Sequence, residues 1–261
     1  MNLPIYWIDA FTDRMFGGNP AAVLPLDSWL DDTLLQRIAM ENGLSETAFF
    51  VRTGPARAEL RWFTPTIEID LCGHATLATA HVLFNQMNQL ESPFVFDTKS
   101  GPLSVASNGA LLELDFPSRP AGPAEPSKEL LAGLGLKPDH VLRSERMWLC
   151  VYKNAQDVVR IAPNHVQLAA AVPGRIIVTA PGDDCDFVSR FFAPDAGVVE
   201  DPVTGSAHST LIPYWAARLG KKRLHARQLS RRGGELWCEL DGERVRMAGH
   251  GVAYLKGSIT I

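Results

Sequence analysis

Two stretches of the chain resemble each other closely enough to indicate an internal duplication. Residues 61–65 read Arg-Trp-Phe-Thr-Pro, and residues 190–194 read Arg-Phe-Phe-Ala-Pro. When Gly73 is aligned with Gly205, Glu68 falls on Glu200, provided that the second copy holds three extra residues. Each copy is followed by a mostly apolar helical segment. A chance match would not keep this order, so we expect two equivalent halves.

The remaining pattern predicts what each half contains. Apolar residues dominate Gly73 to Phe84 and the segment from Gly205 to Gly220, which predicts one buried helix per half. Short strand-like runs surround both helices, for example Ala58 to Phe63. We therefore expect an α+β fold of two pseudo-symmetric domains, each with mainly antiparallel strands wrapped around a central helix. Ser28 is expected to cap a further helix that ends at Asn42-Gly43.

Four prolines within ten residues predict the domain boundary. They occupy positions 117, 120, 123 and 126, and such a segment is typical of a linker. The first half is expected over residues 1–117, the linker over 117–126 and the second half over 127–261. The C-terminal strand can return to the first half. A cleft between the halves would face both helix N-termini.

Composition excludes several classes of function. The chain has 261 residues, of which 25 are basic and 29 acidic, for a net charge of −4. The sequence therefore lacks the excess of basic residues that is typical of nucleic-acid-binding proteins. No segment is long and apolar enough to predict a membrane span. The N-terminus lacks the pattern of a signal peptide, and the four cysteines form no CxxC pair. We expect a cytoplasmic protein with free thiols.

The two helix starts are the best candidates for chemistry. A helix N-terminus offers free N–H groups to an anion such as a carboxylate, and Gly73 and Gly205 allow a ligand to approach closely. Titratable or polar residues stand beside each start; they are Asp70, Cys72, His74, Glu200, Asp201, Ser206 and His208. Acids and bases of this kind are what proton transfer at carbon needs. Alternatively, Asp70 and Asp201 only cap the helices.

Glu46 is a further candidate, because it precedes the apolar run Thr47 to Val51. A carboxylate beside a buried strand is costly unless it is paired or functional. From position alone, a catalytic role and a structural or exposed role both stay open.

Other chemistries find weaker support. A metal held by Cys72, His74 and His208 is disfavoured, because Cys-x-His is not a usual zinc spacing and no fourth ligand stands out. The phosphate-binding motifs GxxxxGK[ST] and GxGxxG are missing from the sequence. Ser206 near His208 lacks the GxSxG context of a serine nucleophile.

Four motifs in order resemble the PhzF family, the phenazine-biosynthesis-like isomerases and epimerases. They are Gly18-Asn19-Pro20-Ala21-Ala22-Val23, Leu44-Ser45-Glu46-Thr47-Ala48-Phe49, Cys72-Gly73-His74-Ala75-Thr76 and Glu200-Asp201-Pro202-Val203-Thr204-Gly205-Ser206-Ala207. The resemblance covers nearly the whole chain. It implies a fold related to diaminopimelate epimerase and proline racemase, with the active site between two like domains.

The resemblance also implies roles for individual residues. Glu46 would take a proton from one carbon of the substrate and return it at another position. His74 and Asp201 would orient the substrate and take part in the proton transfers. Substrate contacts would come from Asn19 and from the amides of Gly73, Gly205 and Ser206. A homodimer is implied by the resemblance alone.

The sequence departs from the related racemases in one respect. Those enzymes use two cysteines, whereas here Cys72 has no counterpart in the second copy. We therefore expect an isomerase that uses no metal or organic cofactor and moves a proton between carbons of a small carboxylate-bearing substrate. The alternatives are a one-thiol epimerase or racemase that uses Cys72 against Asp201 or His208, and a binding protein of the same fold without catalysis.

Overall fold

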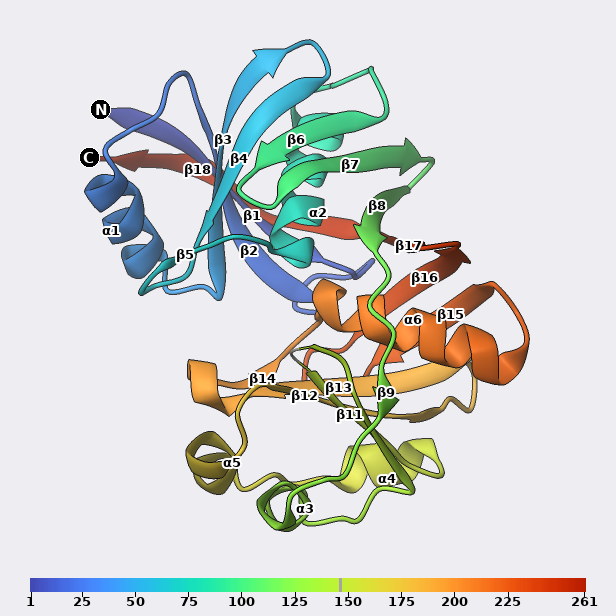
Figure 1. The fold of residues 1–261 in the computed structure, drawn as a ribbon. Coiled ribbons are helices and arrows are strands. Elements are labelled where there is room, and N and C mark those ends of the chain that lie inside the picture. Colours follow the sequence, from blue (N-terminus) through green and yellow to red (C-terminus); the bar gives the residue numbers. More distant parts are fainter. Residues whose placement is uncertain (146) are drawn as a thin grey trace. The chain divides into compact units, whose positions relative to one another are not determined.

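The fold is described from a computed structural model, which covers residues 1–145 and 147–261. The chain divides into two compact units (Figure 1). The first comprises Met1–Asp115 and Ala248–Ile261, and the second comprises Phe116–Met247. The expected linker, residues 117–126, lies within the second unit. It contributes a two-residue strand there, β9 (Gly122–Pro123), which pairs with β10 (His140–Arg143).

The first unit is a mixed sheet with two helices. Its elements are β1 (Asn2–Ala10), β2 (Asn19–Leu26), α1 (Asp32–Asn42), β3 (Glu46–Gly54), β4 (Arg57–Phe63), β5 (Glu68–Ile69), α2 (Gly73–His81), β6 (Phe94–Thr98), β7 (Gly101–Asn108), β8 (Leu111–Pro117) and β18 (Gly251–Thr260). β2 and β3 run parallel, as do β4 and β6, whereas β1 with β2, β3 with β4, β4 with β5, β6 with β7 and β7 with β8 are antiparallel. The last strand returns to the first, so that β18 pairs antiparallel with β1.

The central helix of this unit is α2. All 9 of its residues are buried, which agrees with a sequence that contains no Asp, Glu, Lys or Arg. It packs against β1, β2 and β3, and it continues as a π-helical turn over Val82–Gln86. The strands therefore surround a helix that has no solvent-exposed face, as the sequence predicts.

The helix α1 begins later than the sequence suggested. Its N-cap is Asp31, whose carboxylate accepts a hydrogen bond from the Thr33 N–H at 2.9 Å, so the prediction that Ser28 caps the helix is wrong. An aspartate at this place satisfies a free amide as well as a serine does. The expected end is correct, because Gly43 caps the helix in a left-handed conformation.

The second unit repeats the strand order of the first. Its elements after β9 are α3 (Lys128–Leu134), β10, β11 (Met147–Val151), α4 (Ala155–Arg160), α5 (His165–Ala171), β12 (Arg175–Pro181), β13 (Phe187–Ala193), β14 (Val198–Asp201), α6 (Gly205–Leu219), β15 (Arg223–Gln228), β16 (Gly234–Asp241) and β17 (Arg244–Gly249). β11 and β12 are parallel, β13 is antiparallel to β12 and β14, and β13 is parallel to β15. β2 to β6 follow the same succession of pairings.

The repeated residues make the same contact in both units. Arg61 in β4 forms a two-fold ion pair with Glu68 in β5, at 2.8 and 2.9 Å. Arg190 in β13 forms the equivalent pair with Glu200 in β14, at 2.6 and 3.1 Å. The extra residues of the second copy include a 3₁₀ turn at Pro194–Ala196. The duplication seen in the sequence is thus present as a repeated structural unit.

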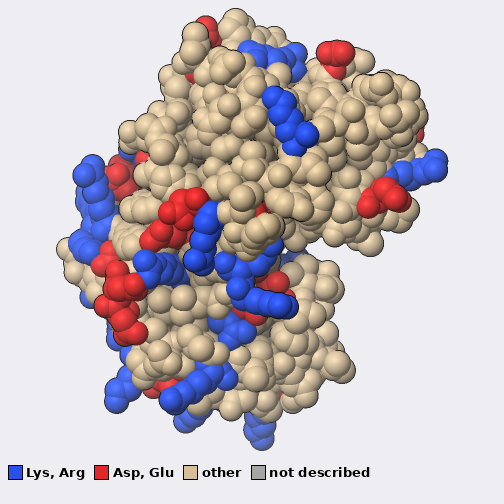
Figure 2. Space-filling model, turned by 180° about the vertical axis from the view of Figure 1, so that it is seen from behind, with Lys and Arg blue, Asp and Glu red and all other residues tan. Residues whose placement is uncertain are grey.

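Surface charge is mixed. On the face drawn in Figure 2, basic and acidic side chains lie beside one another. Ion pairs such as Arg175 with Asp195 and Arg246 with Asp241 illustrate how charges of opposite sign neighbour each other in the second unit. No helix within the described residues has the length and apolar character needed to cross a bilayer.

Candidate active site

The first group of candidate residues gathers around the start of α2. Asn19 and Glu46 are the first residues of β2 and β3, and these strands are parallel, so both residues lie at the same edge of the sheet. Gly73 and His74 open α2, which packs on those strands. The topology therefore brings together three segments that are far apart in the sequence.

Gly18 sets the backbone conformation directly before Asn19. Gly18 has a φ of +59°, and a Cβ there would lie 2.1 Å from the carbonyl oxygen of Ala10. Only glycine tolerates both the conformation and the contact. The Gly-Asn-Pro motif thus places the Asn19 side chain, which is fully buried, beside His74.

His74 is the centre of this group. Its Nε2 lies 3.0 Å from Oε2 of Glu46, and its Nδ1 lies 3.1 Å from the amide nitrogen of Asn19. The contact with Glu46 is an ion pair when the ring is protonated, and the Asn19 amide lies against the opposite ring nitrogen. The His74 side chain is 5% exposed and that of Glu46 16% exposed, so the pair is largely shielded from water. A carboxylate and an imidazole in such contact can exchange a proton.

The Cys72 thiol joins the same group. Its Sγ lies 3.5 Å from His74 Nδ1. Burial and the Glu46 charge raise the pKa of Cys72, so the group is a thiol at neutral pH. Burial alone would lower the pKa of His74, but the neighbouring Cys72 and Glu46 raise it well above the usual value. Because Cys72 stays protonated, we ascribe this rise to the Glu46 carboxylate.

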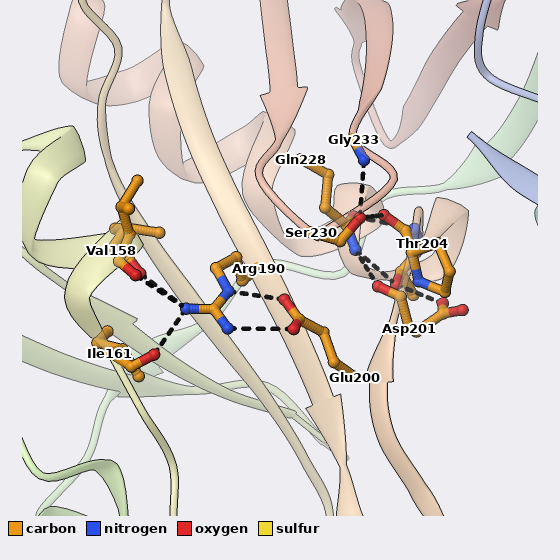
Figure 3. A network of polar contacts seen from close by, with 11 residues as sticks. Val158, Ile161, Arg190, Glu200, Asp201, Thr204, Gln228, Ser230 and Gly233 are labelled. Atoms are coloured by element: carbon orange, nitrogen blue, oxygen red, sulfur yellow. Dashed lines mark hydrogen bonds and ion pairs between the residues drawn. The ribbon is translucent and has the colours of Figure 1, made fainter. Parts of the chain in front are cut away.

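The second group lies at the start of α6. Asp201 ends β14, and its carboxylate accepts a hydrogen bond from the Thr204 hydroxyl at 2.5 Å (Figure 3). Gly205 is the first residue of α6, and Ser206 follows it with a half-buried side chain. The sequence brings these residues together because they are adjacent in the chain. Amides in the first turn of a helix of this length favour a bound anion.

Gln228 fixes the segment between Asp201 and Thr204. Its amide oxygen accepts from the Thr204 N–H at 2.9 Å, and its amide nitrogen donates to the Asp201 carbonyl at 2.8 Å. Ser230 donates to the Pro202 carbonyl at 2.8 Å. Sequence reasoning missed Gln228 and Ser230, because neither belongs to a motif and both act at a distance of more than twenty residues along the chain.

Two sequence expectations about this region need correction. Asp70 and Asp201 are not helix caps, because Cys72 and Thr204 hold the N-cap positions of α2 and α6. His208, proposed as an alternative partner of a thiol, lies fully buried in α6, where its Nδ1 donates to the Thr204 carbonyl at 2.8 Å. Burial lowers the pKa of His208 to about 4, so its ring is neutral.

One set of side chains in the described parts of the chain offers metal ligands close together. Its members are Glu46, Cys72 and His74, whose ligand atoms lie within 4.8 Å of one another. The expected ligand His208 belongs to the second unit and is not part of this set.

Comparison with known proteins places this geometry in context. The family of phenazine biosynthesis-like proteins, PhzC-PhzF, matches residues 8–257. An uncharacterized isomerase from Pseudomonas aeruginosa is 50% identical over 261 residues, which is the whole of both chains. The crystal structure of a PhzF-family protein from Enterococcus faecalis superposes with a TM-score of 0.97 at 46% identity, covering 100% of both chains.

A more distant likeness concerns the fold. A hydroxyproline epimerase from Agrobacterium vitis superposes with a TM-score of 0.65 at 10% identity, covering 99% of this chain and 92% of the epimerase. The expected relation to the proline racemase type of fold is confirmed.

Proposed function

The chain belongs to the PhzC-PhzF family of phenazine biosynthesis-like proteins, and we propose that it is an isomerase that moves a proton between carbons of a small carboxylate-bearing substrate. The reaction would be pure acid–base chemistry and would need neither a metal nor an organic cofactor. The observation that carries the proposal is the shielded contact of 3.0 Å between Glu46 and His74.

Glu46 is the proton-abstracting base in this proposal. A base needs to be ionised and within reach of its proton, and its partner must stabilise it in both protonation states. His74 meets the second need, because its raised pKa favours a proton beside the Glu46 carboxylate. Asn19 holds the ring in position from its other side. Glu46 takes the proton from one carbon of the substrate and returns it to another carbon. The reaction therefore balances without any external acid.

The helix starts would bind the substrate. Each helix start offers backbone amides that would suit a substrate carboxylate or the enolate oxygen that develops as the proton leaves; these amides belong to Gly73 in the first unit and to Gly205 and Ser206 in the second. Asp201 is the second acid–base group of the proposal. Its hydrogen bond from Thr204 keeps the carboxylate in one orientation, which suits a group that accepts or delivers a proton at one position.

A second candidate is a one-thiol epimerase. The contact between Cys72 Sγ and His74 Nδ1, at 3.5 Å, favours it because the ring could receive the thiol proton. The raised pKa of Cys72 opposes it, because the thiolate is the form that takes a proton from carbon. We therefore rank the carboxylate mechanism first. A binding protein without catalysis is the third candidate.

Hydrogen exchange at carbon tests all three candidates. The protein is incubated in D2O with a panel of amino acids and hydroxy acids, and loss of C–H signal is followed by proton NMR. The carboxylate mechanism predicts exchange that Glu46→Gln abolishes and Cys72→Ser retains. Loss of exchange in Cys72→Ser, with retention in Glu46→Gln, would establish the thiol mechanism instead. A ligand that binds without exchange would favour the third candidate, and activity that a chelator removes would refute the cofactor-free reaction.

A further inference from the structure

The Cys72 thiol is the one member of the first group that the proposed reaction leaves without a role. It lies at the N-cap of α2, 3.5 Å from Nδ1 of His74, and is buried to 6% exposure. The opposite ring nitrogen, Nε2, contacts Glu46 at 3.0 Å. Sulfur, imidazole and carboxylate therefore form one chain of contacts.

The spacing of sulfur and nitrogen suits a tetrahedral metal ion. Zinc binds thiolate at about 2.3 Å and imidazole at about 2.0–2.1 Å, so a tetrahedral angle puts the two donor atoms about 3.6 Å apart. The observed separation is 3.5 Å. A divalent ion can therefore replace the thiol proton between Cys72 and His74, provided that the Asn19 amide, which lies 3.1 Å from the same Nδ1, turns its N–H group away.

Glu46 completes the arrangement without binding the metal. An ion takes only one nitrogen of a histidine ring, and here Nδ1 faces the sulfur while Nε2 faces Glu46. Histidine ligands commonly donate their other N–H to a carboxylate, which orients the ring and makes it more basic. The Glu46 side chain is 16% exposed, but its Oε2, the atom in contact with His74, is buried.

We propose that Cys72 and His74 bind a thiophilic divalent cation such as Zn²⁺, and that this ion inhibits the enzyme. On binding, the Cys72 S–H bond breaks, a sulfur–metal bond forms and the proton passes to the solvent. Water molecules complete the coordination. The ion holds the imidazole beside Glu46, so His74 no longer exchanges protons; this inhibition rests on the proposed function. Ions that prefer oxygen ligands, such as Mg²⁺, do not bind.

Cobalt provides a direct test of binding. Co²⁺ is titrated into the full-length protein and the sulfur-to-cobalt charge-transfer band is followed in the near ultraviolet. We expect a saturable band that Cys72→Ser abolishes and that excess Zn²⁺ displaces. Cys185→Ser serves as the matched control, because this half-buried thiol belongs to the second unit, donates to the Phe187 carbonyl and should leave the band unchanged. Glu46→Ala should keep the band and weaken binding roughly 10–100-fold.

Two results would overturn the site, and a third would separate it from the proposed function. A band of unchanged affinity in Cys72→Ser, or none in the wild type at millimolar Co²⁺, refutes metal binding. Circular dichroism confirms that each variant is folded, and His74→Asn provides a second variant that should lose the band. Carbon–hydrogen exchange that continues in the zinc-saturated protein would refute inhibition and the role of His74, while leaving the binding site itself established.

Discussion

Replacing Arg190 by methionine tests whether the repeated ion pair stabilises the second unit. In the wild type, Arg190 binds Glu200 through two hydrogen bonds, at 2.6 and 3.1 Å (Figure 3). Its third nitrogen donates to the carbonyls of Ile161 and Val158, at 2.7 and 3.1 Å. Methionine fills much of the same volume and removes every one of these donors. The substitution therefore isolates the polar contribution of the side chain.

The burial of the pair sets the size of the effect. The Arg190 side chain is 12% exposed and that of Glu200 23% exposed. Breaking a buried ion pair by removing one partner costs about 3–5 kcal/mol, and the partial exposure of Glu200 puts the loss near the lower limit, at about 3 kcal/mol. For a unit of this size, that corresponds to a drop in Tm of roughly 10 °C.

The first unit offers a matched control. Arg57 forms an equally short two-fold pair with Asp97, at 2.6 Å for both bonds, but this pair is far more exposed. Surface ion pairs contribute little to stability, so Arg57→Met should shift the urea midpoint far less than Arg190→Met does. Both variants are measured by urea unfolding and by calorimetry. If Arg190→Met is no less stable than Arg57→Met, burial does not set the strength of these pairs and the reasoning fails.

Two further predictions concern α6 and the segment before it. Gln228→Leu removes the acceptor of the buried Thr204 N–H and the donor to the Asp201 carbonyl, so the free energy of unfolding should fall by about 2–4 kcal/mol, and the Thr204 amide should exchange faster with D2O in NMR. Gln89→Leu, whose contacts are exposed, should change stability by about 0.5 kcal/mol or less; equal effects of the two substitutions would contradict this assignment. His208 has a folded-state pKa of about 4 and an unfolded value near 6.5, so the unfolded state alone binds this proton between those pH values and stability falls as the pH drops through them. Between pH 7 and pH 5 the wild type should lose about 2 kcal/mol more than His208→Gln in urea unfolding, and equal losses would show that His208 does not titrate on unfolding.

The features that depend on short-range pattern could be predicted from the sequence. The buried helices α2 and α6 and the glycine ends of α1 and α6 follow from local chemistry, and the fold contains each of them. The repeat also predicted contacts between strands. The aligned acids Glu68 and Glu200 are the ion-pair partners of the aligned arginines.

The features that were missed depend on contacts between distant residues. Gln228 meets Thr204 across 24 positions, and nothing in the residues around it distinguishes it from a surface glutamine. The helices α4 and α5 have 6 and 7 residues, which is too short for a clear hydrophobic period. The proline-rich segment was expected to be a linker at the domain boundary, and the two units divide beside it, between Asp115 and Phe116. Composition alone does not reveal that β9, within this segment, pairs with β10.

The pairing of β1 with β18 has a consequence for biosynthesis. The two chain ends lie next to each other (Figure 1), and Asn2 pairs with Thr260. β18 is translated after every other strand of the two units, so β1 cannot complete its ladder until both units have been synthesised. The second unit is one continuous stretch, Phe116–Met247, and every one of its strands has emerged by then. We therefore expect the later-encoded unit to fold first on the ribosome, with an exposed edge of β1 as the place where nascent chains need protection from aggregation.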